Sequence, residues 1–309
     1  MHPAYSVILF TTASGAGYGL LALLGLVGIS HGEASSLAFG LTAMVIALGL
    51  VTVGLLSSTF HLGHPERAWR ALSQWRSSWL SREGVAAVVA YVPAVLFGAV
   101  WSGLVDAPGL LKPLAVLTAV MALITVVCTG KIYSTLATIR AWNNQLTVPV
   151  YLAFALATGA CMLAAITCVF GNFPSFLVFF SSAWLVVAAV LKLAYWNSID
   201  KAPRDRTIEA ATGLGRIGRV SQWEVPHTSA NYVQKEMGYA VARKHAAKLR
   251  RLVILALVLA VLLMLSALAV PYAALPAAAL ALFAAVVERW LFFAEAQHVV
   301  TLFYGTKAA

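Results

Sequence analysis

The sequence predicts an all-α integral membrane protein that crosses the membrane eight times. Hydrophobic residues make up 61% of the 309 residues and charged residues only 10%, and the mean hydropathy is +0.86. Soluble domains are less apolar and more charged than this. Eight apolar runs also have the length of about 20 residues that a helix needs to span the hydrocarbon layer. They occupy residues 5–29, 37–62, 84–104, 111–137, 147–170, 174–197, 251–270 and 274–303.

The connections between these runs are short, and Pro and Gly mark most of them. Only the connection between the sixth and seventh runs, residues 198–250, is long. We therefore expect one membrane domain over residues 1–309, with room for two four-helix bundles. The first run has no basic residues before it and no processing site, so we expect a spanning helix and not a signal peptide.

The charge distribution predicts the orientation of the chain. The formal net charge is +10, and 17 of the 21 Lys and Arg residues lie on the side shared by both predicted termini, against Lys112 alone on the other side. The positive-inside rule then places both termini and the long loop in the cytoplasm. Anionic lipid and topology account for the basic residues, so we expect membrane lipid as a partner and no nucleic acid.

Ionisable residues at the ends of the runs are the strongest functional candidates. His61 ends the second run and Glu83 begins the third, and both side chains are costly to place in hydrocarbon. Glu295 and His298 lie late in the eighth run, in the same leaflet by the charge count. Four titratable groups in one leaflet exceed what packing needs, and they predict a proton-handling site. Two weaker candidates in that leaflet are Lys131 and Tyr133.

The eighth run carries its acidic residues at helical spacing. Glu288, Glu295 and His298 follow one another at intervals of seven and three residues, so we expect all three on one face of a helix. For Glu288 alone, an ion pair with Arg289 or with a neighbouring helix that only holds the bundle together is an equal alternative.

The stretch between the second and third runs is rich in basic and aromatic residues. Each basic residue there could be an interfacial anchor or part of a docking surface for a partner protein. The candidates are His64, Arg67, Arg70, Arg76 and Arg82.

Several cofactors are disfavoured by the residues present. Cys128, Cys161 and Cys168 lie inside apolar runs without the close spacing of an iron–sulfur or zinc site, so we expect packed core residues. His61 and His298 would be the one histidine pair for a haem, and both map to one leaflet, so no haem is expected. The sequence GLGRIG at residues 213–218 satisfies GxGxxG, but no strand precedes it, and we expect no dinucleotide site there.

The sequence resembles a known family along essentially its whole length. The carriers of the resemblance are FHLGHPERAWRALSQWRSSWLSRE, the eight-run pattern and ERWLFFAEAQHVVTLFYG. They are similar to the membrane-anchor subunits of dimethyl sulfoxide reductase-type molybdenum enzymes. The long loop is similar to that of the branch that includes anchors of cytoplasmic sulfite dehydrogenases.

The resemblance implies partners, cofactors and a site. It implies a molybdopterin catalytic subunit and a four-cluster iron–sulfur subunit, with those cofactors held only by the partners. It implies an anchor without haem that exchanges electrons with ubiquinone or menaquinone, and it places His61 and Glu83 in quinol binding. The long-loop branch favours electron flow from sulfite to quinone, and a quinol-oxidising anchor of a DMSO-type reductase is the alternative.

Two other function classes remain open at this point. A secondary transporter also has intramembrane acidic residues, although broken helices near the midplane and sequence repeats are typical of that class. A haem-bearing cytochrome subunit that oxidises quinol is the second.

Overall fold

The computed structural model describes residues 5–32, 35–62, 64–171, 173–203, 206–224 and 240–304, without the side chains of residues 60, 61 and 240–244. Eight helices in these ranges are long and apolar enough to span a membrane, which confirms the predicted fold class. They are α1 (Tyr5–His31), α2 (Leu37–Ser57), α3 (Trp79–Trp101), α4 (Pro108–Ser134), α5 (Thr147–Val169), α6 (Ser175–Asp200), α9 (Ala240–Ser266) and α10 (Ala274–Ala294).

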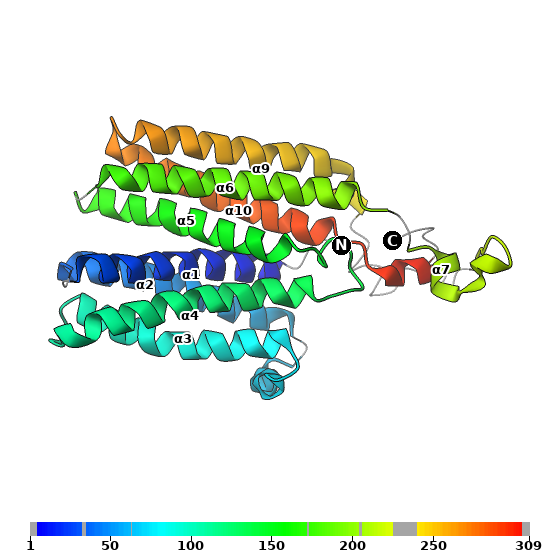
Figure 1. The fold of residues 1–309 in the computed structure, drawn as a ribbon, viewed down its shortest axis with the longest axis horizontal. Helices are drawn as coiled ribbons and strands as arrows, with labels where there is room; N and C mark the ends of the chain where they lie inside the picture. Colours follow the sequence, from blue (N-terminus) through cyan, green and yellow to red (C-terminus); the bar gives the residue numbers. More distant parts are fainter. Residues whose placement is uncertain are drawn as a thin grey trace.

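The spanning helices form two bundles of four. Helices α1, α2, α3 and α4 pack together, and α5, α6, α9 and α10 form the second group beside them (Figure 1). Within the first bundle α1 packs against α2 and α4, and α3 packs against α4. Within the second, α9 lies against α10 and α6, and α5 lies against α6 and α10.

The two bundles meet where α1 packs against α5. A Cβ atom added at Gly19 would meet the backbone of Ala155, and one added at Gly159 would meet the backbone of Gly19. Small residues allow such close approach of backbones, which is how helices in a membrane gain packing energy when hydrophobic burial offers none. Because α1 and α5 are also the most deeply buried spans, this contact lies at the centre of the molecule.

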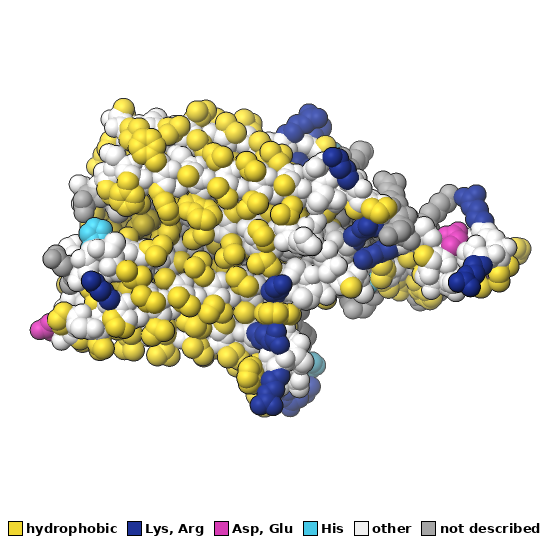
Figure 2. Space-filling view, in the orientation of Figure 1, with side chains coloured by type: hydrophobic (Ala, Val, Ile, Leu, Met, Phe, Trp, Pro, Cys, Tyr) yellow, Lys and Arg dark blue, Asp and Glu magenta, His cyan; other side chains and the backbone are white. Residues whose placement is uncertain are grey.

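The start of α1 and the end of the described chain after α10 lie at the same end of the bundles (Figure 1). Lys and Arg side chains gather at this end, while hydrophobic side chains cover the sides of the helices (Figure 2). The 3-10 helices described at this end include η1 (Ser58–His61) and η2 (Pro65–Gln74) between α2 and α3, and η5 (Val299–Tyr304) after α10. At the opposite end, η4 (Pro271–Ala273) joins α9 to α10.

The structure corrects several predicted boundaries. Helix α2 ends at Ser57 and the chain continues as η1, so His61 is not part of the spanning helix. Helix α3 begins at Trp79, where the side chain of Ser78 accepts a hydrogen bond from the backbone N–H of Ser81, so Glu83 is one turn inside the helix. Helix α10 ends at Ala294, nine residues before the predicted end at residue 303.

The long loop contains α7 (Ile208–Thr212) and η3 (Leu214–Arg216). Gly213 has a φ of 70°, a left-handed conformation that ends α7 and is typical of glycine at a helix C-terminus. The glycines of GLGRIG thus form a turn, and none of the described residues forms a named strand before it. Gln222 Nε2 donates to the carbonyl of Phe303 at 2.6 Å, which joins the loop to η5. Residues 225–239 of the long loop lie outside the described residues.

Candidate functional site

An open cavity of about 680 Å³ lies at the basic end of the first bundle. Its lining comes from α1, α2, η1, η2, α3, α4 and α10, together with the segment that follows α4. Most of the lining side chains are apolar. Four of the site residues predicted from the sequence also line the cavity. These four are His64, Arg67, Glu83 and Tyr133.

Glu83 is the acidic residue of this cavity. The side chain is 4% exposed, and its Oε1 atom accepts a hydrogen bond from Thr129 Oγ1 on α4 at 2.5 Å. Gly84 follows, and a Cβ atom there would meet the Leu72 side chain of η2, so η2 lies directly over the start of α3. The carboxyl is therefore held by α4 at the wall of an apolar cavity.

His61 is placed by its backbone alone. It is the last residue of η1, and its neighbours Thr59 and Leu62 line the cavity. The side chain of His61 lies outside the described residues.

His64 and Arg67 lie at the exposed rim of the cavity. His64 Nδ1 lies 3.0 Å from Glu66 Oε1, and Arg67 Nε lies 3.7 Å from the same oxygen atom. More than half of each of these side chains is exposed, so the ion pairs are weak and solvated.

Arg82 fastens the segment before α3. Its Nε atom donates to the carbonyl of Trp75 at 2.9 Å and its Nη2 atom to that of Arg76 at 2.6 Å, while its guanidinium lies 4.4 Å from the centre of the Trp79 ring. The described contacts of the Glu83 carboxyl are with Thr129 and include no ion pair with Arg82.

Arg70 and Arg76 lie over the rings of Trp69 and Trp75, at 5.6 Å and 5.5 Å from the ring centres. Both tryptophans are exposed. Amphipathic pairs of this kind are suited to the headgroup region of a membrane or to a protein interface.

Tyr133 belongs to an aromatic cluster that closes the inner wall of the cavity. Its ring contacts those of Trp142, Tyr151, Phe292 and Phe293, with ring centres 5.1–5.8 Å apart. Trp142 Nε1 donates to the carbonyl of Phe292 at 2.8 Å, which ties the segment after α4 to α10. Lys131 faces elsewhere, with its Nζ atom 5.9 Å from the centre of the Trp79 ring.

His298 does not share a helix face with Glu288 and Glu295, contrary to the prediction. Glu288 is fully buried, with its Oε1 atom 2.5 Å from Lys192 Nζ and its Oε2 atom 3.4 Å from Arg289 Nη2. Glu295 is the C-cap of α10 and pairs with Arg250 at 2.6 Å. His298 follows three residues later, beyond the helix, because the chain leaves α10 to form η5.

His298 is held in place by contacts with backbone groups. It forms an isolated antiparallel bridge with Ile139, and its Nδ1 atom accepts from the backbone N–H of Val300 at 2.9 Å. Partial burial lowers the pKa of His298. With Nδ1 in use as an acceptor, the neutral ring is the form that this contact favours.

The partners of the predicted residues were not evident from the sequence. Thr129 is one of many threonines in apolar helices, and nothing in its local sequence marks it as the hydrogen-bond donor to Glu83. Arg250 also bonds Asp200 through both terminal nitrogen atoms, at 2.6 and 3.1 Å. The spacing of Asp200, Arg250 and Glu295 over three helices gives no local signal for this network.

The fold and the cavity define a polytopic membrane protein with an apolar cavity under a basic, aromatic cap. The model of the DMSO reductase anchor subunit (DmsC) family matches residues 1–306. A similar protein, a subunit of the sulfite dehydrogenase of Allochromatium vinosum, is 32% identical over 330 aligned positions that cover all of both chains. The chain belongs to the DMSO reductase anchor subunit family and is a membrane anchor of a molybdopterin oxidoreductase.

The buried ion cluster of the second bundle yields a test of charge balance. Glu288→Gln would leave Lys192 and Arg289 without a counter-charge, whereas Lys192→Met would leave the Glu288–Arg289 pair in place. An uncompensated buried charge costs about 3–5 kcal/mol. We expect Glu288→Gln to lower the unfolding temperature of the detergent-solubilised protein much more than Lys192→Met, with the exposed Lys112→Met as control. Equal losses in the two cluster variants would contradict this charge balance.

Proposed function

We propose that this chain is the quinone-reactive subunit of its complex and passes electrons between an iron–sulfur subunit and membrane quinone. The single observation that carries the proposal is the cavity with Glu83 in its wall. A quinone site needs an apolar slot, hydrogen-bonding groups and a path to water. The cavity combines apolar walls with the Glu83 carboxyl inside and the exposed side chains of His64 and Arg67 at its rim.

A bound quinone would supply two carbonyl oxygens and take up two electrons with two protons. Glu83 can hold and release a proton at its carboxyl, and Thr129 fixes the orientation of that carboxyl. The rings of Tyr133, Trp142 and Phe293 line the inner side of the cavity. We propose His61 as a hydrogen-bond donor beside the same cavity, because Thr59 before it and Leu62 after it both line the cavity.

The basic segment from His64 to Arg82 is proposed as part of the docking surface for the iron–sulfur subunit. That subunit is expected to carry four clusters and to hold the molybdopterin subunit at the same end of the anchor. The exposed guanidinium groups and tryptophans over η2 support this assignment, as does their position beside the cavity mouth. The basic end then faces the cytoplasm and the chain lies in a bacterial inner membrane.

The direction of electron flow is proposed from the sulfite dehydrogenase relative. Full-length similarity to a subunit of that enzyme supports oxidation of sulfite, with electrons passed to quinone. Membership of the DMSO reductase anchor family favours a second candidate, an anchor that oxidises quinol for a DMSO-type reductase.

Glu83→Gln is expected to slow quinone-linked turnover of the assembled complex. The substitution keeps the shape of the side chain but removes the exchangeable proton, and proton transfer by a positioned group contributes roughly 10²–10⁴-fold to such steps. The measurement is the ratio of quinone-linked to artificial-dye-linked activity, with Asp106→Asn, an exposed residue at the opposite end of the bundles, as the control. A parental ratio in Glu83→Gln would remove Glu83 from the site.

His61→Leu is expected to weaken quinone binding by about 1–3 kcal/mol, because the substitution removes the proposed hydrogen-bond donor.

Sulfite is expected to reduce a quinone analogue when the intact complex is supplied with both. The test compares sulfite-dependent quinone reduction with DMSO-dependent quinol oxidation in the same membrane preparation. DMSO-dependent activity without sulfite activity would reverse the proposed direction.

The partners are expected to face the cytoplasm. They should resist protease added to intact spheroplasts and be digested in inverted vesicles, and the anchor should purify together with two soluble subunits. Digestion in intact spheroplasts would contradict the orientation, and an anchor that purifies alone would favour a transporter.

A further inference from the structure

The proposed quinone cavity needs an opening toward lipid as well as one toward water. Membrane quinones carry a long isoprenoid tail, and a cavity of about 680 Å³ has the size that encloses a small molecule. The ring and the first part of a tail can fill this space, so the rest of the tail must leave it. The exposed side chains of His64 and Arg67 mark the side of the cavity that faces water. The packing of the helices indicates where the side toward lipid lies.

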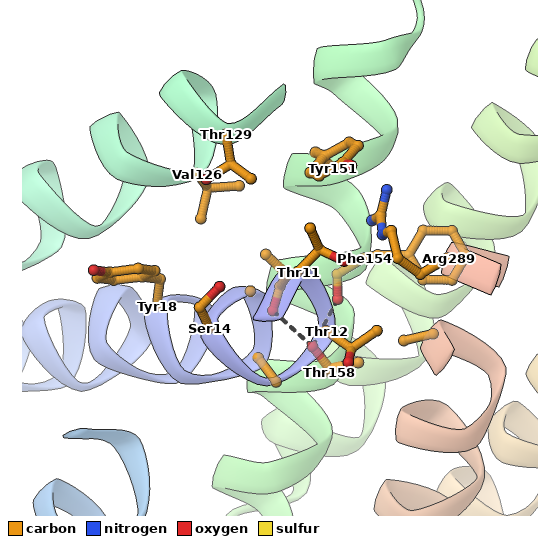
Figure 3. A pocket seen from close by; sticks show the side chains of 14 residues that line it. Thr11, Thr12, Ser14, Tyr18, Val126, Thr129, Tyr151, Phe154, Thr158 and Arg289 are labelled. Carbon is orange, nitrogen blue, oxygen red and sulfur yellow. Dashed lines mark hydrogen bonds between the residues drawn. The ribbon is translucent and has the colours of Figure 1, made fainter. Parts of the chain in front are cut away.

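The cavity does not continue inward to the centre of the molecule. Thr129 donates to the Glu83 carboxyl and also lines a second cavity on the inner side. This second cavity has a volume of about 20 Å³ and is lined by α1, α4, α5 and α10 (Figure 3). A space of this size has room for about one or two water molecules, which is too little for a hydrocarbon chain.

Close packing also closes several sides of the cavity. Between α1 and α2, a Cβ atom added at Gly54 would meet the backbone nitrogen of Ser14. Between α3 and α4, the hydrogen bond from Thr129 to Glu83 joins the helices at the level of the cavity. Toward α10, the aromatic cluster around Tyr133 fills the space. A tail therefore has no path between these packed helices.

Helices α2 and α3 pack most closely at the end opposite the cavity. There, a Cβ atom added at Gly40 would lie 3.0 Å from the Cα atom of Ser102, and one added at Gly98 would lie 3.1 Å from the Met44 side chain. Few contacts in all join the two helices along their described lengths. They therefore diverge toward the basic end and leave a gap that opens into the cavity.

One hydrogen bond spans this gap near the middle of the two helices. The Tyr91 hydroxyl group on α3 lies 2.7 Å from Thr52 Oγ1 on α2. Because Thr52 donates to the carbonyl of Leu48, Tyr91 is the donor in this bond. At 1.5 Å per residue, Tyr91 lies about 12 Å beyond Glu83 along α3. Half of the hydrocarbon layer is about 15 Å thick, so the gap lies in the leaflet at the basic end.

The walls of the gap are apolar and continue into the wall of the cavity. Leu55 of α2 and Leu80 of α3 both line the cavity. Leu80 is also 55% exposed, so this part of the cavity wall reaches the outer surface of the bundle. Residues 52–59 and 84–91, which border the gap, contain no charged side chain. An apolar opening between two spanning helices faces lipid.

We propose that the gap between α2 and α3 is the entrance through which quinone reaches the cavity from the leaflet at the basic end, and that the isoprenoid tail stays in this gap while the ring lies beside Glu83. The inference rests on the proposed quinone function and adds to it the path of the substrate. The hydrogen bond between Tyr91 and Thr52 forms the inner edge of the entrance.

The order of polar and apolar surface favours a quinone over a phospholipid as the occupant. A quinone carries uncharged carbonyl groups at one end of an otherwise apolar molecule, which matches a carboxyl at the inner end of an apolar gap. A phospholipid in the same place would bring its phosphate group to the Glu83 carboxyl, and two like charges repel each other strongly in a medium of low dielectric constant.

Photoaffinity labelling of the assembled complex locates the tail directly. The probes are a benzoquinone and a naphthoquinone, each with an alkyl tail that carries a diazirine group. We expect labels on residues 52–59 of α2 and residues 80–91 of α3, and an excess of the unlabelled quinone should compete with them. A fatty acid with the same diazirine group is the control for ordinary acyl chains.

Leu80→Trp narrows the entrance and provides a second test. Tryptophan is common at the membrane interface, so the fold should tolerate it there. We expect the competed label to fall, and KM for the quinone with a tail to rise, by about tenfold, because the larger side chain overfills the opening. Leu96→Trp is the matched control, because Leu96 is half exposed on the same helix and does not line the cavity. It should keep the parental label and KM.

Competed label on helices other than α2 and α3, or a parental label and KM in Leu80→Trp, would overturn the entrance. Label in the gap that excess quinone does not remove would assign the gap to an ordinary acyl chain and would also overturn it. If Glu83→Gln lowers the activity ratio while the competed label lies elsewhere, the quinone site stands and the entrance is rejected. No competed label on this chain, together with a parental ratio in Glu83→Gln, would reject the quinone function itself.

Discussion

The hydrocarbon layer requires that every ionisable side chain within it be enclosed by protein or reach a surface. Glu83, Lys192, Glu288 and Arg289 meet this constraint by lying inside the bundles, each at most 4% exposed. Enclosure depends on close helix packing, and the contact of α1 with α5 at Gly19 and Gly159 supplies it where the bundles meet. The buried ionisable side chains therefore depend on the close packing of small residues.

Two polar systems result, one in each bundle. In the first, Glu83 lies at the wall of an open apolar cavity, with one hydrogen bond from Thr129. In the second, Glu288 is locked between two cations and has no opening to the surface among its described contacts. This difference in access is why we assign the proposed quinone site to Glu83 and not to the Glu288 cluster.

The sequence predicted the spans, the shared end of the termini and the buried cysteines, because these follow from hydrophobic length and charge counts. It predicted Glu83 as a site residue because a carboxyl beside an apolar run is costly without a role. The predicted place of His298 on the eighth helix was wrong, since the apolar run continues past Ala294 while the helix does not. Periodicity places residues on a helix face only where the helix exists. Thr129, Trp142 and Arg250 were missed because their partners come from other helices, which no local pattern reveals.

Binding of quinone in the cavity beside Glu83 is the step on which the proposed function depends. An experimental structure of the intact complex with a bound quinone or quinone-site inhibitor would test it without relying on activity. We expect the ring of the quinone or inhibitor to lie between η2 and the start of α3. One of its polar atoms should lie within hydrogen-bonding distance of the Glu83 carboxyl or the His61 ring. A ring bound instead beside Arg250 and Glu295, with none in the cavity at Glu83, would contradict the proposed site.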